Sequence, residues 1–142
     1  MLRRGTLAIA STLLLAAGCA QTAPQPAGDE LAGTSWRLAR FRGGDGKVAI
    51  PGDRTSYTLA FNRDGTVSAR IDCNRGHGSY KTSGSQIEFG PMATTRAMCP
   101  PGSMDDQVVR QIPYIRSYMI KEGRLFLSLM ADGGTYEFEP LK

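Results

Sequence analysis

The stretch TSYTLAFNRDGTVSARID, residues 55–72, decides the fold of this chain. Apolar and polar side chains alternate on both sides of a central NRDG turn, and alternation with a period of two residues is typical of strands with one buried face. Gly65 suits the positive φ that a tight hairpin turn often requires. The stretch therefore predicts an antiparallel hairpin. Its expected inward side chains are Tyr57, Leu59, Phe61, Val67, Ala69 and Ile71.

Strand signals of the same kind run on both sides of this hairpin. In the first of them, the alternation places Arg40 on the same face as Trp36 and Leu38. Two shorter strands are indicated by GSY and QIEFG. The longer expected strands are Thr34–Phe41, Tyr114–Ile120, Arg124–Leu129 and Thr135–Pro140.

The last three expected strands form a meander, because glycine-bearing turns separate them. These turns are KEGR and MADGG. In the final strand, Tyr136 and Phe138 alternate with Glu137 and Glu139. We therefore expect one face of this strand to be in contact with water.

One short amphipathic helix is expected, at about Met104–Ile112. Ser103 can cap its first turn, and Asp106 follows three residues later in an arrangement that resembles a capping box. Pro113 disfavours continuation of the helix at its end. Its expected buried side chains are Val108, Val109 and Ile112.

These elements indicate a mainly β (α+β) domain. We expect a strongly bent antiparallel sheet or a partly open β-barrel of about seven to eight short strands, with one short helix packed across it. A length of 142 residues fits one such domain. The net charge of +4 falls to about +2 without Arg3 and Arg4, and the other arginines are scattered. The charge therefore gives no reason to expect a nucleic-acid partner.

The N-terminus, MLRRGTLAIASTLLLAAGCA, has the charged, apolar and small-residue parts of a secretory signal. Its LAAGC is similar to the lipobox of bacterial lipoproteins, in which the cysteine becomes the lipid-bearing first residue. We expect residues 1–18 to be a signal peptide that is removed, Cys19 to carry the lipid that anchors the chain to a membrane, and residues 19–30 to be a flexible linker. Residues 31–142 would then be the folded domain, on an outer-membrane lipoprotein of the cell envelope that faces the periplasm.

Cys73 and Cys99 would be the two remaining thiols of such an exported chain. In an oxidising compartment the simplest expectation is a disulfide, which would stabilise the domain by about 3.5 kcal/mol through loop closure. Two other interpretations stay open at this stage. His77 could join both cysteines in a metal site, or could act with Cys73 as a nucleophile. Neither has the expected spacing or partners, so we expect no metal, no cofactor and no catalysis.

Four segments resemble the META domain, or HslJ-like, family: LAGTSWRL (31–38), DCNRGHGSY (72–80), FGPMATTRAMCP (89–100) and GRLFLSLMADGGTYEFEP (123–140). The commonest form of the family has glycine before the first cysteine and an aromatic residue after Asn-Arg, whereas this chain has Asp72 and Gly76-His77. The resemblance implies a β-rich fold crossed by a helix, and its two cysteines fall on Cys73 and Cys99. The motif residues that it marks as a candidate binding loop are Asn74, Arg75, His77, Tyr80, Thr95 and Arg96.

The resemblance also implies a non-enzymatic envelope lipoprotein linked to heat shock and antibiotic tolerance. Such a protein would support envelope integrity or stress tolerance by binding an envelope protein or lipid partner, with the domain itself a monomer. The alternative is an inhibitor of lysozyme or of a protease, with Asp72–Tyr80 as a rigid inserted loop. A carrier of an apolar ligand also stays open, because bent sheets can enclose a cavity.

Overall fold

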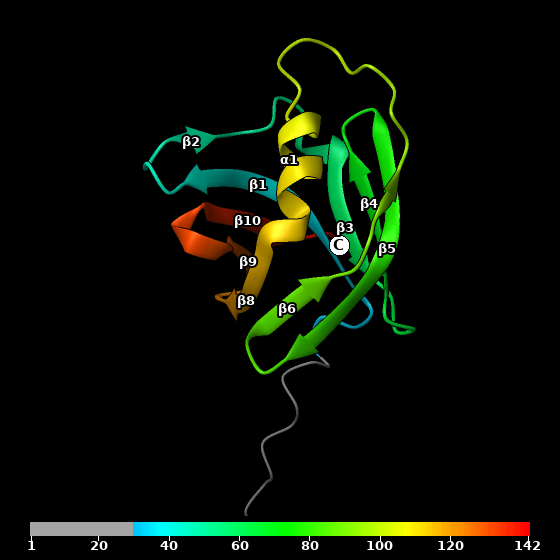
Figure 1. Cartoon of the computed structure of the whole chain (residues 1–142), viewed down its shortest axis with the longest axis vertical. Helices are drawn as coiled ribbons and strands as arrows, with labels where there is room; N and C mark the ends of the chain where they lie inside the picture. Colours follow the sequence, from blue (N-terminus) through cyan, green and yellow to red (C-terminus); the bar gives the residue numbers. More distant parts are fainter. Residues whose placement is uncertain (1–29) are drawn as a thin grey trace, which may run out of the picture.

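The computed structural model describes residues 30–142, which form a β-barrel crossed by one α-helix (Figure 1). Within these residues, no helix has the length and apolar character that crossing a bilayer demands. The main elements are β1 (Thr34–Gly43), β2 (Val48–Ala49), β3 (Tyr57–Phe61), β4 (Thr66–Ile71), β5 (Asn74–Ser83), β6 (Gln86–Phe89), β7 (Ala93–Thr94), α1 (Asp105–Gln111), β8 (Ile115–Lys121), β9 (Arg124–Leu129) and β10 (Gly134–Pro140). Three 3₁₀ turns, Arg54–Ser56, Ile112–Tyr114 and Met130–Asp132, complete the list.

The predicted hairpin is confirmed as β3 and β4. Tyr57 lies opposite Ile71 and Phe61 lies opposite Val67, so all the expected inward residues share one face. Gly65 has a φ of 82° in the turn, as its position requires.

Eight antiparallel strands close into a barrel, in the order β1-β3-β4-β5-β6-β8-β9-β10 and back to β1. The first and last strands pair from Trp36↔Pro140 to Gly43↔Gly134, which forms a long seam. The β6–β8 contact is much shorter, with Gln86↔Ser117 as its ladder pair. The mainly β class, the strand number and the crossing helix are therefore confirmed, and the barrel is closed.

A β-bulge changes the expected alternation of β1. The register with β10 shifts between Leu38 and Arg40, so Arg40 moves to the outer face and Phe41 becomes buried. The prediction that Arg40 shares a face with Trp36 is therefore wrong. A strict period of two cannot anticipate an extra residue in one strand.

The stretch Asp72–Tyr80 is mostly a strand, so the expected GSY strand is confirmed and the prediction of a loop before it is wrong. Asn74–Ser83 forms β5, which pairs with both β4 and β6. Its glycines serve close packing: a Cβ on Gly76 would lie 2.8 Å from the Met92 sulfur, and one on Gly78 would lie 2.9 Å from a backbone oxygen. They make room for the segment around Met92 and Thr94, which runs along β5.

The outer face of β10 is drier than expected. Glu137 is only 6% exposed, because Arg40 and Arg124 cover it and donate hydrogen bonds to its carboxylate. Burial alone would raise the pKa of Glu137, but the hydrogen bonds and positive charges of these two arginines together outweigh it and lower the pKa below its usual value. The expectation of a wet face is therefore wrong at Glu137.

Helix α1 is slightly shorter than predicted and begins differently. Ser103 Oγ accepts the backbone N–H of Asp105 at 3.1 Å, but the N-cap residue is Met104, so the expected capping box with Asp106 does not form. Tyr57, in the barrel wall, accepts the backbone N–H of Met104 at 2.8 Å. This bond fixes the start of the helix against β3.

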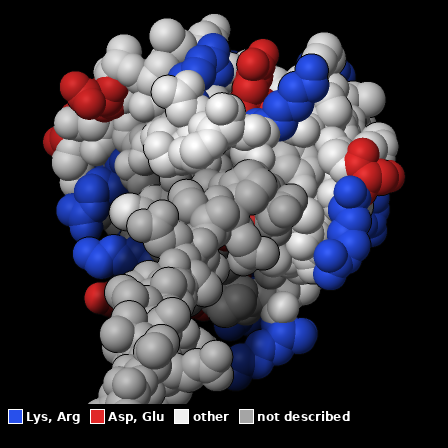
Figure 2. Space-filling model, turned by 90° about the horizontal axis from the view of Figure 1, so that it is seen from below, with Lys and Arg blue, Asp and Glu red and all other residues white. Residues whose placement is uncertain are grey.

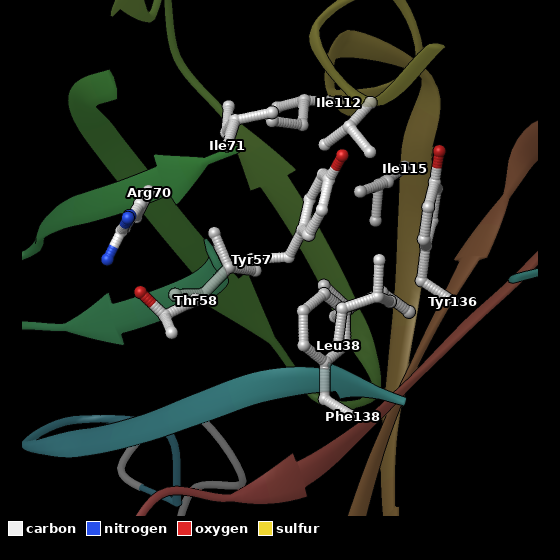
Figure 3. Close-up of a pocket in the computed structure, with 12 residues that line it drawn as sticks. Leu38, Tyr57, Thr58, Arg70, Ile71, Ile112, Ile115, Tyr136 and Phe138 are labelled. Atoms are coloured by element: carbon white, nitrogen blue, oxygen red, sulfur yellow. The ribbon is translucent and has the colours of Figure 1, made fainter. Parts of the chain in front are cut away.

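The barrel interior beneath α1 is filled by side chains. The hollow there measures about 20 Å³ and lies among residues such as Tyr57, Ile112 and Tyr136 (Figure 3). That volume holds about one water molecule, so this hollow has no room for an apolar ligand. Burial also raises the pKa of Tyr136 to about 12.

Candidate binding surface beside the disulfide

The sulfurs of Cys73 and Cys99 are bonded, with the two Cα atoms 5.5 Å apart. This fits the pairing expected from the sequence, and it leaves neither sulfur as a free thiolate. Cys73 lies in the tight turn between β4 and β5, and the preceding Asp72 has a φ of 55°. Glycine adopts this left-handed backbone without strain, and aspartate is among the residues that tolerate it. The position is therefore one that glycine would also suit.

Asn74 is the centre of the hydrogen bonds around the disulfide, although only 3% of it is exposed. Its Oδ1 accepts the backbone N–H of Ala97 at 2.7 Å and the Thr95 hydroxyl at 3.0 Å. Its Nδ2 donates to Ala97 O at 3.0 Å and to Asp105 Oδ2 at 3.2 Å. One amide therefore joins the start of β5, the segment before α1 and the helix itself.

The segment that follows β6 runs along β5. Thr94 lies opposite Gly76 in the short β7 ladder. The backbone N–H of Thr95 then donates to Arg75 O at 2.9 Å, and the N–H of Arg75 donates to Thr95 Oγ1 at 2.9 Å. These bonds fix the segment as one wall of a groove whose other wall is α1.

The groove has a polar end next to the disulfide, with a volume of about 370 Å³. Arg96 lies on one wall, and Asp105 and Asp106 lie on the helix. No ion pair of Arg96 occurs within residues 30–142, whereas Asp106 has only a long contact of 3.9 Å to Arg110. Charged groups with such weak partners are available to a ligand.

The groove continues into an apolar end of about 320 Å³. The two ends share Thr94 and Val109, which makes them continuous. The apolar end is lined chiefly by Phe89, Pro91, Met92, Val109, Ile112 and Pro113. We call the two ends together the helix groove.

The structure separates the six motif residues expected to bind. Asn74, Thr95 and Arg96 line the helix groove or support it. Arg75 and His77 point outward from β5 and are exposed. Tyr80 packs in the core, with its ring 4.8 Å from that of Phe61. Cys19 lies outside the described residues.

Sequence reasoning missed the groove residues on α1. The pattern of a helix indicates which face is buried, but it does not indicate which part of the helix surface the neighbouring segment before α1 leaves open. Sequence reasoning also missed Met98, which is 99% exposed. The available signal was that Met98 precedes Cys99, which is fixed by the disulfide. Because Cys99 is held in place, the Met98 side chain has little freedom to turn inward.

The described part of the chain contains no group of three or more His, Cys, Asp or Glu side chains that could hold a metal ion. Figure 2 shows the end of the barrel opposite the β7–α1 connection, where basic and acidic side chains are interspersed around the rim. The Lys and Arg side chains visible on this face do not form one continuous patch.

Comparison with known proteins gives a family and a fold. The META domain model matches residues 29–142. An NMR structure of a protein from Burkholderia xenovorans is similar at a TM-score of 0.69 and 23% identity, over 92% of this chain and 99% of that one. A crystal structure of a DUF4847 family protein from Bacteroides vulgatus is similar at a TM-score of 0.58 and 16% identity, over 78% of this chain and 94% of that one. Identities this low show a shared fold alone. None of the curated proteins matches the chain.

Proposed function

The chain belongs to the META domain family, and we propose that it is a non-enzymatic lipoprotein of the bacterial envelope that binds a protein or lipid partner. Through that partner it would support envelope integrity or tolerance of heat and antibiotics. The N-terminal sequence supports the location: a charged start, an apolar run and LAAGC ending at Cys19 are typical of a lipid-anchored protein. We infer an outer-membrane anchor and a domain that faces the periplasm.

The helix groove is the observation that carries the binding proposal. It is continuous, it has an apolar end and a charged end, and its walls are fixed by a disulfide and by the buried Asn74 amide. Binding sites for molecules of moderate size combine an apolar surface with a few placed polar groups in this way. A filled barrel core favours this outer surface over the interior as the place where a partner binds.

The alternative, an inhibitor of lysozyme or of a protease, was expected to act through Asp72–Tyr80. Most of that stretch is β5, which has strands on both sides and cannot enter a cleft. An inhibitor would therefore need a different loop.

Genetic complementation tests the proposal. A strain that lacks the protein should be more sensitive to heat or to envelope-directed antibiotics, and the wild-type chain should restore it. We expect Cys19→Ala to restore it poorly, because the domain would no longer stay at the membrane. Val109→Glu should also restore it poorly, since it puts a charge where the two ends of the groove meet.

Ser68→Glu is the matched control, because Ser68 is exposed on β4, away from the groove. It should restore the strain as well as the wild type, at equal protein level and equal thermal stability. A deletion strain that is indistinguishable from its parent would contradict the proposal, as would full restoration by Val109→Glu. A photo-crosslinker at position 109 should capture a partner that the same group at position 68 does not.

A further inference from the structure

The connection between β7 and α1 projects from one end of the molecule. Figure 1 shows it as the arch at the top, at the opposite end from the start of the described chain. Its most prominent side chain is Met98, which is 99% exposed and makes no contact with the apolar core. Single exposed apolar side chains are common on protein surfaces, so the inference rests on how firmly the backbone around Met98 is held.

The backbone of this arch is bound from its inner side at alternate residues. Thr95 donates its backbone N–H to Arg75 O, and both backbone groups of Ala97 bind the Asn74 side chain. Across residues 30–142, no hydrogen-bond partner exists for the backbone groups of Arg96 and Met98. The outer edge of the arch therefore offers unpaired backbone donors and acceptors to another protein.

Met98 is held on both sides. Asn74 binds both backbone groups of Ala97, and the disulfide fixes Cys99 to Cys73. The two supports come from adjacent residues at the start of β5. A segment that is already rigid loses little conformational entropy when it binds, which favours affinity.

We propose that this arch, residues 95–101, is an inhibitory loop for serine endopeptidases whose primary specificity pocket is apolar. Met98 would fill that pocket, and the free backbone groups of Arg96 and Met98 would pair with the exposed strand edge of the protease cleft. The inference goes beyond the proposed function, because it requires neither the helix groove nor an envelope partner.

The two supports also explain why such a loop would resist digestion. The protease serine would attack the Met98 carbonyl carbon, and the bond to the Cys99 nitrogen would break to give an acyl-enzyme and a free amine. That amine cannot diffuse away, because the disulfide holds Cys99 beside β5. It would attack the acyl-enzyme in turn, re-form the peptide bond and release the serine, so that no net hydrolysis occurs.

Inhibition assays with the oxidised full-length chain test this directly. Chymotrypsin, elastase and subtilisin accept apolar side chains, and trypsin, which requires Arg or Lys, is the comparison enzyme. We expect inhibition of at least one of the first three and none of trypsin. Met98→Asp should weaken that inhibition by about 30-fold or more, the scale of a residue that dominates an interface.

Met98→Arg should lose the same inhibition and gain inhibition of trypsin. Met130→Arg is the matched control, because Met130 is also exposed but lies in the β9–β10 connection. It should behave as the wild type. Since both methionines are exposed, equal melting temperatures would show that any loss is local.

Three results would each overturn the inference. The first is no inhibition of any apolar-pocket enzyme at micromolar protein, and the second is equal behaviour of Met98→Arg and wild type. The third is steady cleavage after Met98 at the rate of an ordinary substrate. None of these would affect the helix-groove proposal, whose test uses Val109.

Discussion

Replacement of Asn74 by alanine should weaken the whole domain, because one side chain joins three segments. The substitution removes four hydrogen bonds to nitrogen and oxygen partners, on Thr95, Asp105 and both backbone groups of Ala97, and a weaker one to the Cys99 sulfur at 3.4 Å. Each such bond contributes about 0.5–1.5 kcal/mol net. Thr95 and Ala97 are exposed and can bind water instead, so we expect the lower part of the range, about 2–4 kcal/mol in the free energy of unfolding.

Urea denaturation and thermal melting measure this loss. For a domain of this size, 1 kcal/mol corresponds to roughly 4 °C, so the melting temperature should fall by about 8–16 °C. Asn62→Ala is the matched control, because the Asn62 amide binds mainly one partner, Thr66 Oγ1 at 2.9 Å in the β3–β4 turn. It should cost less than about 1 kcal/mol.

Asn74→Asp separates the role of the amide nitrogen from that of side-chain size. The variant keeps an acceptor for Ala97 N–H but loses every bond that the amide nitrogen donates, and it places a second carboxylate beside Asp105. At neutral pH it should be destabilised at least as much as Asn74→Ala. If either Asn74 variant were as stable as Asn62→Ala, Asn74 would not hold these segments together.

Three further predictions concern other parts of the fold. The double variant Cys73→Ser/Cys99→Ser should lose about 3.5 kcal/mol, seen as a lower urea midpoint without reductant, and an unchanged midpoint would contradict the disulfide's role. The pKa of Glu137 is lower in the folded state, so its contribution to stability should be complete above the unfolded pKa of about 4.3 and be lost as the pH falls through the folded pKa. In melting experiments at a series of pH values, Glu137→Gln should therefore differ most from wild type near neutral pH and least in acid. Gly44→Ala should destabilise the domain by about 1–3 kcal/mol, since its Cβ would lie 1.9 Å from Asp132 O, whereas Gly52→Ala, which has open space, should stay within about 0.5 kcal/mol.

The strand pattern alone predicted most of the barrel. Alternation with a period of two placed both strands of the β3–β4 hairpin correctly, because one face of each strand packs in the core. The glycine-bearing turns placed the β8–β10 meander. Alternation could not reveal the bulge after Leu38, since two residues there oppose one on β10. The bulge turns Arg40 to the outer face, where it covers Glu137. That contact joins residues almost a hundred positions apart in the sequence.

Only part of the candidate site could be predicted from the sequence. The family motif marked Asn74, Thr95 and Arg96, which do lie together at the disulfide. It also suggested a loop at 72–80, because glycines usually indicate a bend. Gly76 and Gly78 instead leave room for the segment that runs along β5, and a contact between separate parts of the chain leaves no local signal in the sequence.

The pairing of β1 with β10 has a consequence for how the molecule is made. The two strands lie at opposite ends of the folded chain, and Leu141 N–H still donates to Ser35 O at 2.8 Å. The free edge of β1 therefore stays uncovered until β10, the last strand of the chain, has been synthesised and pairs with it. A topology with such distant partners folds slowly, on a scale of milliseconds to seconds. During that interval the unpaired β1 is open to capture by a chaperone, or by the same strand of another newly made copy.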